Sequence, residues 1–212
     1  MIVIIDYKAG NLTSVARAVS HLGFRCEISQ HIGKIALADR IIIPGVGAAG
    51  SAMSNLRMLG LDKAIRQAYA EGIPILGICL GSQIIMEVSE ENQAGCLGLI
   101  PGFVQRFPNP LNTSEGDRLK VPHMGWNRII RCRSHPILEG IDPKSEFYFV
   151  HAYFPKPEFQ DSVIAITDYG ISFPSAVGLK NLIAFQFHPE KSGRPGLKLL
   201  ENFCTWDGGY AE

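Results

Sequence analysis

The stretch Ile73-Pro74-Ile75-Leu76-Gly77-Ile78-Cys79-Leu80-Gly81-Ser82 decides the fold class of this 212-residue chain. Its first six residues are an apolar run rich in isoleucine, which predicts a buried strand. The run ends at a cysteine flanked by glycines, and residues 82–89 then show the apolar spacing of a helix. A buried strand that leads directly into a helix is the repeating unit of a parallel sheet with crossover helices.

The residues before this stretch show the same alternation of strands and helices. Apolar runs and turn signals predict strands at residues 2–5, 24–29, 41–43 and 73–78, and helical spacing predicts helices at residues 12–22, 48–59 and 61–71. This half of the chain therefore predicts the parallel core of a sheet.

The second half is strand-rich and mostly lacks connecting helices. Strands are expected at residues 97–107, 127–132, 147–151, 163–167, 175–179 and 182–187, and a closing helix at residues 196–203. We therefore predict one α/β domain over residues 1–212, an open mixed sheet whose parallel core is flanked by helices and extended by antiparallel strands. On such sheets ligands bind outside the carboxyl ends of the parallel strands, where Cys79 and the turn Pro44-Gly45-Val46-Gly47 both fall.

Composition excludes several classes of protein. Hydrophobic residues make up 46% of the chain and charged residues 19%, which is too apolar for a disordered protein. Twenty basic residues balance twenty acidic ones, so no nucleic-acid or acidic-membrane partner is indicated. The sequence has neither a run of about 20 apolar residues nor a signal peptide, and a cytoplasmic protein is expected. Its five cysteines form no Cys-x-x-Cys pair, so neither a disulfide framework nor a metal site is indicated. No cofactor is expected.

Gly77-Ile78-Cys79-Leu80-Gly81 has the form Gly-x-nucleophile-x-Gly, in which a tight turn holds the reactive atom above the sheet. Cysteine thiols are only a few per cent ionised at neutral pH, so a catalytic cysteine needs a base or another group that favours the thiolate. A helix N-terminus beside the cysteine has that effect. The structural alternative is a small buried cysteine that closes a strand. The glycines on both sides favour catalysis.

Phe185-Gln186-Phe187-His188-Pro189-Glu190 supplies a candidate base at the end of the last predicted strand. Residues two apart in extended chain point to the same side, so Glu190 can accept a hydrogen bond from His188 and fix its tautomer. Taken alone, this pair would be a strand-end histidine and a solvated carboxylate. Beside a cysteine elbow it predicts a Cys79, His188 and Glu190 triad.

Catalysis by a thiolate also needs hydrogen-bond donors for a negatively charged oxygen. The Leu80 amide at the elbow is one candidate, and the turn Pro44-Gly45-Val46-Gly47 offers further amides close to a ligand. A Pro-Gly-x-Gly turn without function is otherwise the commoner case.

In combination, Pro-Gly-Val-Gly, Gly-Ile-Cys-Leu-Gly and His-Pro-Glu resemble the triad-type (class I) glutamine amidotransferases. The segments at residues 6–12, 120–127, 147–151 and 188–193 make the chain similar to the glutaminase subunits of imidazole glycerol phosphate synthases. The resemblance covers residues 2–203. It implies that Cys79 attacks the side-chain amide of glutamine, that His188 transfers protons, and that a glutamyl thioester is hydrolysed to glutamate after ammonia has left.

The same resemblance assigns the other site residues. Val46, after its peptide turns, and Leu80 would be the oxyanion donors, and the glutamine-binding residues would be Gly47, Gln83, His151, Ala152 and Tyr153. Ammonia would pass to a (β/α)8-barrel cyclase subunit in a heterodimer. Near that interface the family places the residues that match Asn11, His123, Trp126, Tyr148 and Lys191. Without the resemblance, Trp126 and Tyr148 would pack an edge of the core, His123 would cap a turn and Lys191 would be a surface charge.

Two positions depart from the pattern of the family. Ser82 stands where most members have Met, and Ala152 stands where Ser or Thr is usual. Three alternatives stay open at this point, the first of them because of these departures. They are a paralogue that supplies ammonia to another synthase, such as one that modifies a surface-polysaccharide sugar, a stand-alone γ-glutamyl cysteine hydrolase, and a non-catalytic subunit that has kept the fold.

Overall fold

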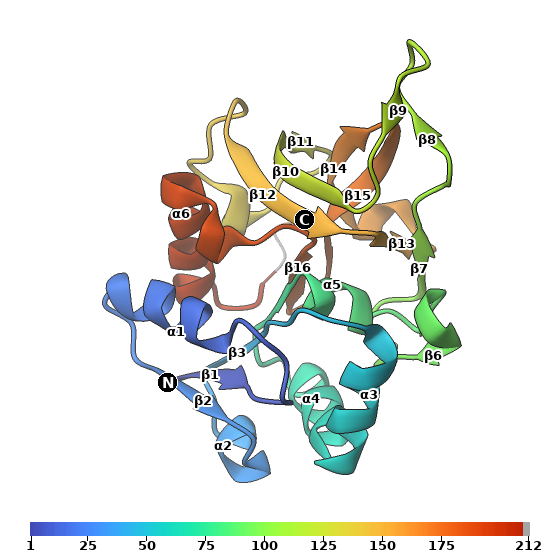
Figure 1. Ribbon diagram of the computed structural model, residues 1–212. Coiled ribbons are helices and arrows are strands. Elements are labelled where there is room, and N and C mark those ends of the chain that lie inside the picture. Colours follow the sequence, from blue (N-terminus) through green and yellow to red (C-terminus); the bar gives the residue numbers. More distant parts are fainter. Residues whose placement is uncertain (210–212) are drawn as a thin grey trace.

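An eight-stranded mixed sheet forms the centre of the molecule in the computed structural model, which describes residues 1–209 (Figure 1). Its strands, in spatial order, are β11 (Ile130–Arg131), β14 (Val163–Tyr169), β15 (Ile171–Leu179), β16 (Leu182–Phe185), β4 (Ile75–Ile78), β3 (Arg40–Ile43), β1 (Ile2–Ile5) and β2 (Cys26–Ser29). The strands from β16 to β2 are parallel, and β15, β14 and β11 continue the sheet with antiparallel pairing. The predicted fold class is confirmed.

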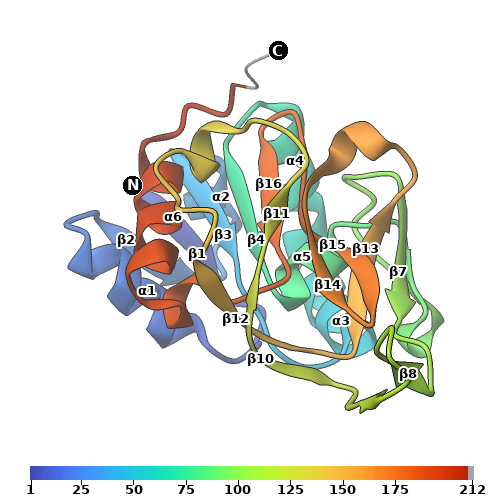
Figure 2. The ribbon, with the colours of Figure 1, turned by 90° about the horizontal axis from the view of Figure 1, so that it is seen from above.

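Helices cover both faces of this sheet (Figure 2). They are α1 (Leu12–His21), α2 (Ile32–Ala36), α3 (Ala49–Met58), α4 (Leu61–Ala70), α5 (Leu80–Ile84) and α6 (Gly193–Thr205). Side chains of β1 alternate between the two faces: Ile2 and Ile4 join the apolar cluster that includes α1 and α6, while Val3 and Ile5 join the cluster that includes α2, α3 and α4. Strands buried on both faces explain the unbroken apolar runs of the sequence. Of the helices within residues 1–209, none is long and apolar enough to span a membrane.

One strand from the second half of the chain, β16, joins the parallel core beside β4. Phe185 pairs with Ile78 in parallel register, and the Cys79 amide donates to the Phe185 carbonyl at 2.8 Å. The carboxyl ends of both strands therefore reach the same edge of the sheet. This pairing brings the histidine segment beside the cysteine elbow, although the two are more than a hundred residues apart in sequence.

A smaller sheet and two ribbons complete the fold. The smaller sheet has the order β13 (Tyr153–Pro157), β7 (Gly102–Arg106), β5 (Val88–Ser89), β6 (Ala94–Gly95), and the ribbons are β10 (His123–Arg128) with β12 (Glu146–His151) and β8 (Leu111–Asn112) with β9 (Arg118–Leu119). Short 3-10 turns lie at η1 (Glu91–Gln93), η2 (Pro136–Leu138), η3 (Gln160–Ser162) and η4 (Pro189–Lys191). The β10–β12 ribbon crosses the face seen in Figure 1 above the carboxyl ends of the parallel strands.

Several predicted elements differ in the structure. The strand expected over residues 127–132 is divided between β10 and β11, which belong to different sheets. The helix expected over residues 82–89 ends at Ile84, because the Ile84 carbonyl accepts the Leu97 amide at 2.8 Å instead of a helical donor. The strand expected from residue 97 begins only at Gly102, after the turn that these hydrogen bonds close. The unpredicted strand β13 lies at the edge of its sheet, where Pro155 removes no needed hydrogen bond.

Candidate active site

Cys79 lies on a strained turn between β4 and α5. Its backbone has φ 53° and ψ −105°, a conformation that costs a non-glycine residue about 1–3 kcal/mol. A Cβ on Gly81 would collide with the Ile43 carbonyl oxygen, and one on Gly77 would lie 2.9 Å from the Ala184 Cβ. Both flanking residues must therefore be glycine. The strain is the structural mark of an elbow that presents a side chain at the end of a strand.

His188 and Glu190 form a fully buried pair. The His188 Nδ1 lies 2.7 Å from the Glu190 Oε1, and both side chains have no exposed surface. The backbone also holds the histidine, because the His188 amide donates to the Tyr148 carbonyl at 2.9 Å. Ser192 adds a bond from its hydroxyl to the His188 carbonyl at 2.6 Å. Because the carboxylate accepts from Nδ1, the other ring nitrogen, Nε2, is left for the reaction.

The pKa of His188 reports what surrounds that ring. Burial lowers it, but interactions with the Cys79 sulfur and the Glu190 carboxylate outweigh burial and raise the pKa to about 9. The ring therefore favours its protonated form when both partners are ionised. Burial raises the pKa of two other buried thiols, Cys96 and Cys204, to about 11 and about 12.

Asn11, which was expected at the partner interface, lies against the triad carboxylate. It precedes α1 in a left-handed conformation with φ 76°, and its side-chain amide donates to the Glu190 Oε1. The carboxylate therefore bonds to both His188 and Asn11 through one oxygen. Any movement of the loop before α1 would act on Glu190.

A cavity of about 300 Å³ opens beside the cysteine. Its wall contains all five predicted glutamine-binding residues together with Cys79 and both predicted oxyanion residues. The lining residues are Val46, Gly47, Cys79, Leu80, Gln83, Glu91, Pro122, Val150, His151, Ala152 and Tyr153. Residues from both halves of the chain thus share one concave site of the size of a small polar molecule.

The predicted oxyanion donor Leu80 is occupied in this structure. Its amide donates to the Gly45 carbonyl at 3.2 Å, so the site where a negative oxygen would sit holds a carbonyl oxygen instead. Val46, in the same turn, has a partly exposed side chain. The turn must change conformation before both amides can serve as donors.

Two residues of the site were missed from the sequence. Glu91 follows β5 and is the only carboxylate among the residues that line the cavity; its Oε2 accepts the Ala49 amide at 2.7 Å. Gln186 is buried, with its Nε2 3.8 Å from the Cys79 sulfur, and its Oε1 accepts from Gln83 at 3.1 Å. A signal for Gln186 was present, because it alternates with Phe185 and Phe187 and therefore points to the same side as His188.

The remaining predicted interface residues separate into exposed and buried ones. Trp126 is 54% exposed and packs edge-on against Tyr148, with ring centroids 5.9 Å apart. The Lys191 ammonium lies 5.9 Å from the centre of the Tyr148 ring. Trp126 and Tyr148 lie on the β10–β12 ribbon beside the exposed side chain of Met124, and Lys191 adjoins them from η4.

His123 does not join that surface, since it is only 2% exposed. Its ring stacks between Phe149 and Tyr169, and its Nδ1 lies 3.1 Å from the His151 Nε2. Our expectation of a partner contact for this side chain therefore needs correction. The alternation along β10 explains it, because His123 points inward while its neighbours Pro122 and Met124 are exposed.

The geometry of this pair fixes both tautomers. The His151 Nδ1 lies 2.8 Å from the Tyr153 carbonyl, so it carries the proton and leaves Nε2 to accept from His123. Burial lowers the pKa of His151 to about 3 and that of His123 to about 4. Both rings are therefore neutral, and His151 forms a rigid part of the cavity wall.

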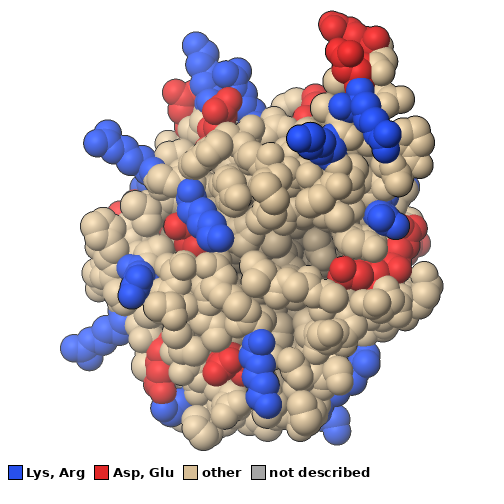
Figure 3. Space-filling view, viewed as in Figure 1, with Lys and Arg blue, Asp and Glu red and all other residues tan. Residues whose placement is uncertain are grey.

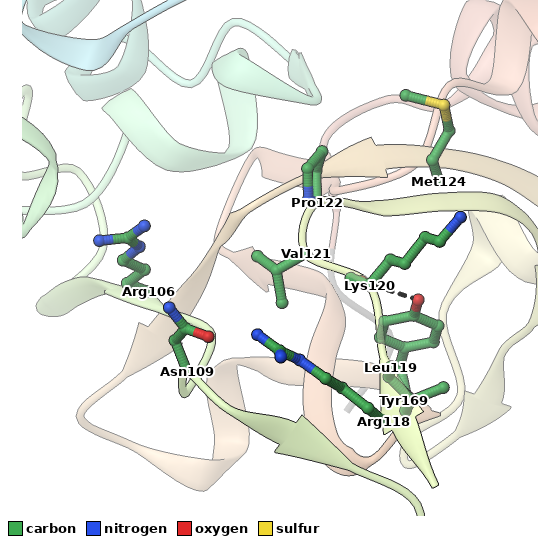
Figure 4. Close-up of a pocket in the computed structure, with 9 residues that line it drawn as sticks. All are labelled: Arg106, Asn109, Arg118, Leu119, Lys120, Val121, Pro122, Met124 and Tyr169. Atoms are coloured by element: carbon green, nitrogen blue, oxygen red, sulfur yellow. Dashed lines mark hydrogen bonds between the residues drawn. The ribbon is translucent and has the colours of Figure 1, made fainter.

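A second, larger cavity of about 1050 Å³ adjoins the first, since Pro122 lines both. Figure 4 shows the side chains of Arg106, Asn109 and Arg118 around it. Lys120 also lines it, and its carbonyl accepts the Tyr169 hydroxyl at 2.9 Å. Among the described residues that line it, none is acidic. Figure 3 shows that basic and acidic side chains both stand around the edge of this face, and that its centre is largely uncharged.

Comparison with known proteins identifies the family. The class I glutamine amidotransferase family matches residues 3–206. This chain belongs to that family. Among curated relatives, the imidazole glycerol phosphate synthase subunit HisH of Desulfovibrio desulfuricans is 52% identical over 97% of this chain and 94% of its own length. The HisH subunit of Dehalococcoides mccartyi strain 195 is 47% identical over 96% of both chains.

Solved structures agree on the amidotransferase fold. A glutamine amidotransferase crystal structure covers 97% of this chain and 100% of its own, with a TM-score of 0.73 at 19% identity. The structure of PurLQS from Thermotoga maritima covers 96% of this chain and 96% of its own matched chain, with a TM-score of 0.70 at 15% identity. Within the described residues, no group of three or more His, Cys, Asp or Glu side chains could hold a metal ion.

Proposed function

We propose that this chain is the glutaminase subunit of an imidazole glycerol phosphate synthase in histidine biosynthesis. The observation that carries the proposal is the strained cysteine elbow beside the buried His188–Glu190 pair, at a cavity of about 300 Å³. Relatives about 50% identical over nearly the whole chain carry the HisH name, which favours the histidine pathway over a paralogous synthase. We further propose that residues 1–212 form one amidotransferase domain and that the protein is cytoplasmic.

The chemistry uses the triad in two steps. The Cys79 thiolate attacks the side-chain carbonyl carbon of glutamine, and the tetrahedral oxyanion collapses as protonated His188 gives its proton to the departing ammonia. A glutamyl thioester remains. His188 then takes a proton from water, the resulting hydroxide attacks the thioester, and glutamate leaves as the thiolate forms again. Glu190 keeps the His188 Nε2 directed at the reacting atoms.

The cavity supplies groups that suit glutamine. The Glu91 carboxylate fits the α-ammonium group, because it is the only carboxylate among the lining residues. The Gln83 side chain carries both a donor and an acceptor for a polar head group. Ala152 lacks a hydroxyl, so contacts of glutamine at that position are made by the backbone.

Ammonia must leave for a partner, because in bulk water it would be protonated. We assign as partner a (β/α)8-barrel cyclase subunit, which forms imidazole glycerol phosphate. The exposed Trp126 and Met124 on the β10–β12 ribbon suit the apolar centre of that contact. The neighbouring cavity with Arg106 and Arg118 suits an acidic rim on the partner.

Replacing the nucleophile tests the function. Cys79→Ala in complex with the cyclase should abolish glutamine-dependent synthesis and leave ammonia-dependent synthesis intact. Unchanged synthesis from glutamine would make the chain a non-catalytic subunit. A high rate on γ-glutamyl peptides without any partner would instead make it a stand-alone hydrolase. Co-purification from native cells separates the cyclase from another synthase.

Replacing the exposed tryptophan tests the partner surface. Trp126→Ala should weaken binding of the cyclase subunit by more than about 1 kcal/mol, measured by calorimetry. Phe159→Ala is the matched control, because Phe159 is similarly exposed but lies outside the β10–β12 ribbon. Equal affinities for both variants would remove Trp126 from the interface.

A further inference from the structure

Tyr7 is a buried tyrosine that the chemistry above does not use. It follows strand β1, has no exposed surface, and donates a hydrogen bond from its hydroxyl to the Pro44 carbonyl at 2.7 Å. Burial and the nearby Cys79 charge raise its pKa, so the hydroxyl stays protonated and acts as a donor. A hydroxyl buried in the core is costly unless it has a specific partner. Phenylalanine would fill the same space without that cost.

The Tyr7 hydroxyl also packs against Gly45. A Cβ added to Gly45 would collide with the hydroxyl oxygen, and the next nearest atoms would be the Tyr7 Cζ at 3.1 Å and the Ala9 Cβ at 3.4 Å. The hydroxyl therefore fixes two consecutive points of the turn, the Pro44 carbonyl and the Gly45 Cα.

The peptide that follows these two points is the one that blocks the oxyanion site. The Gly45 carbonyl oxygen accepts the Leu80 amide at 3.2 Å. In a planar trans peptide the carbonyl and the N–H point in opposite directions. One rotation of the peptide between Gly45 and Val46 would therefore free the Leu80 amide and present the Val46 amide at the same place.

We propose that Tyr7 is a positioning residue for oxyanion stabilisation. Its hydroxyl holds the peptide between Pro44 and Gly45 in place. The next peptide, between Gly45 and Val46, can then rotate so that the Val46 amide points to the same place as the Leu80 amide. The inference rests on the proposed glutaminase function, because it assigns Tyr7 to the transition state of that reaction. A tyrosine that touches neither substrate nor nucleophile thereby acts through the turn.

Tyr7→Phe in the complex with the cyclase subunit tests this role. Loss of one complete oxyanion donor lowers kcat by about 10²–10³-fold. A donor that is present but poorly positioned loses only part of its stabilisation of the transition state. We therefore expect kcat for glutamine to fall about tenfold. The KM for glutamine should stay within about twofold, because the oxyanion exists only in the transition state. Ammonia-dependent synthesis should not change.

Tyr69→Phe is the matched control, because Tyr69 is a partly buried tyrosine on α4, outside the cavity, and should leave every rate unchanged. A kcat equal to wild type in Tyr7→Phe would overturn the inference. A kcat of the complex above that of the wild type would also overturn it, since the hydroxyl would then hinder the rotation of the peptide rather than support it. If kcat and ammonia-dependent synthesis both fell and the KM for glutamine rose, Tyr7 would have only a structural role, and the inference would be wrong.

Two measurements test the role of Tyr7 without depending on glutamine hydrolysis. In the free wild-type and Tyr7→Phe subunits, hydrogen exchange of the Leu80 amide should be faster in the variant; equal protection would contradict the inference whatever the complex hydrolyses. Gly45→Ala should destabilise the wild type more than it destabilises Tyr7→Phe, because only the wild type has the colliding oxygen. Equal losses of stability would show that the hydroxyl does not hold Gly45. Failure of the proposed function would appear elsewhere, as glutamine hydrolysis that survives Cys79→Ala.

Discussion

Two buried histidine sites lie at this cavity, and the pKa values of their imidazoles are shifted in opposite directions. The pKa of His188 is raised to about 9, while that of His151 is lowered to about 3 and that of its neighbour His123 to about 4. His188 faces a carboxylate and a sulfur that becomes negative. His151 faces a backbone carbonyl and a second histidine.

The difference shows that the partners of a buried imidazole decide its role. An anion on each side makes His188 a group that can hold and release a proton during a reaction. Neutral partners on each side make His151 and His123 a fixed hydrogen-bonded unit with defined tautomers. His188 thus serves proton transfer, and the His151–His123 unit maintains the shape of the cavity.

Glu190→Gln should have the largest effect, because it removes the charge that distinguishes His188. We expect kcat for glutamine to fall roughly 10³–10⁴-fold, as when the carboxylate of a catalytic triad becomes an amide. The fold should persist, since the amide has nearly the same shape, and circular dichroism checks this. Glu146→Gln, at an exposed carboxylate that pairs with Arg128, is the control and should be neutral. Unchanged turnover in Glu190→Gln would remove Glu190 from the reaction.

Variants of His123 test the neutral histidine site, where His123 donates a hydrogen bond to His151. His123→Leu removes the donor to His151, and we expect the KM for glutamine to rise about tenfold, which corresponds to about 1.4 kcal/mol for one lost buried hydrogen bond. His123→Asn places an amide donor near the former Nδ1 and should keep the KM within about threefold. Steady-state kinetics of the complex decides this. An unchanged KM together with weaker binding of the partner would return His123 to the interface.

Much of this arrangement could be predicted from local sequence. The strand before Cys79, the elbow, and the pair His188 and Glu190 each follow from patterns a few residues long. Strand β1 was equally clear, because burial on both faces leaves a continuous apolar run. The fold class followed from the alternation of such segments along the first half of the chain.

The rest depends on contacts that no local pattern encodes. His123 was assigned to the partner interface because it matches a family position, whereas its burial comes from Phe149 and Tyr169 far along the chain. Glu91 lies in a turn after a two-residue strand whose partners are β6 and β7. The position of Asn11 on the Glu190 carboxylate likewise requires two loops 179 residues apart to meet.

The pH dependence of the free energy of unfolding should also differ between the two histidine sites. His123 and His151 are neutral when folded, whereas in the unfolded chain histidines take up protons below about pH 6.5. The unfolded state therefore binds more protons, and the free energy of unfolding falls as the pH drops from about 6.5 toward 4. His123→Asn removes one of these groups, so its slope should be smaller by about 1 kcal/mol per pH unit. Urea unfolding at several pH values measures this, and equal slopes would mean that His123 is not held neutral.

The smallest expected effect is on the titration of His188 itself. Because its pKa is raised to about 9, the folded protein keeps a proton that the unfolded chain releases, and the resulting stability is present below about pH 6.5 and lost as the pH rises through 9. Cys79→Ala removes the sulfur and should lower the pKa of His188, measured from its ring protons by NMR. Glu190 remains, so the pKa should stay well above that of His151. A value that does not move would assign the whole effect to the carboxylate. A value below the ordinary range would show that burial dominates at both sites, and the contrast between them would then depend on the sulfur alone.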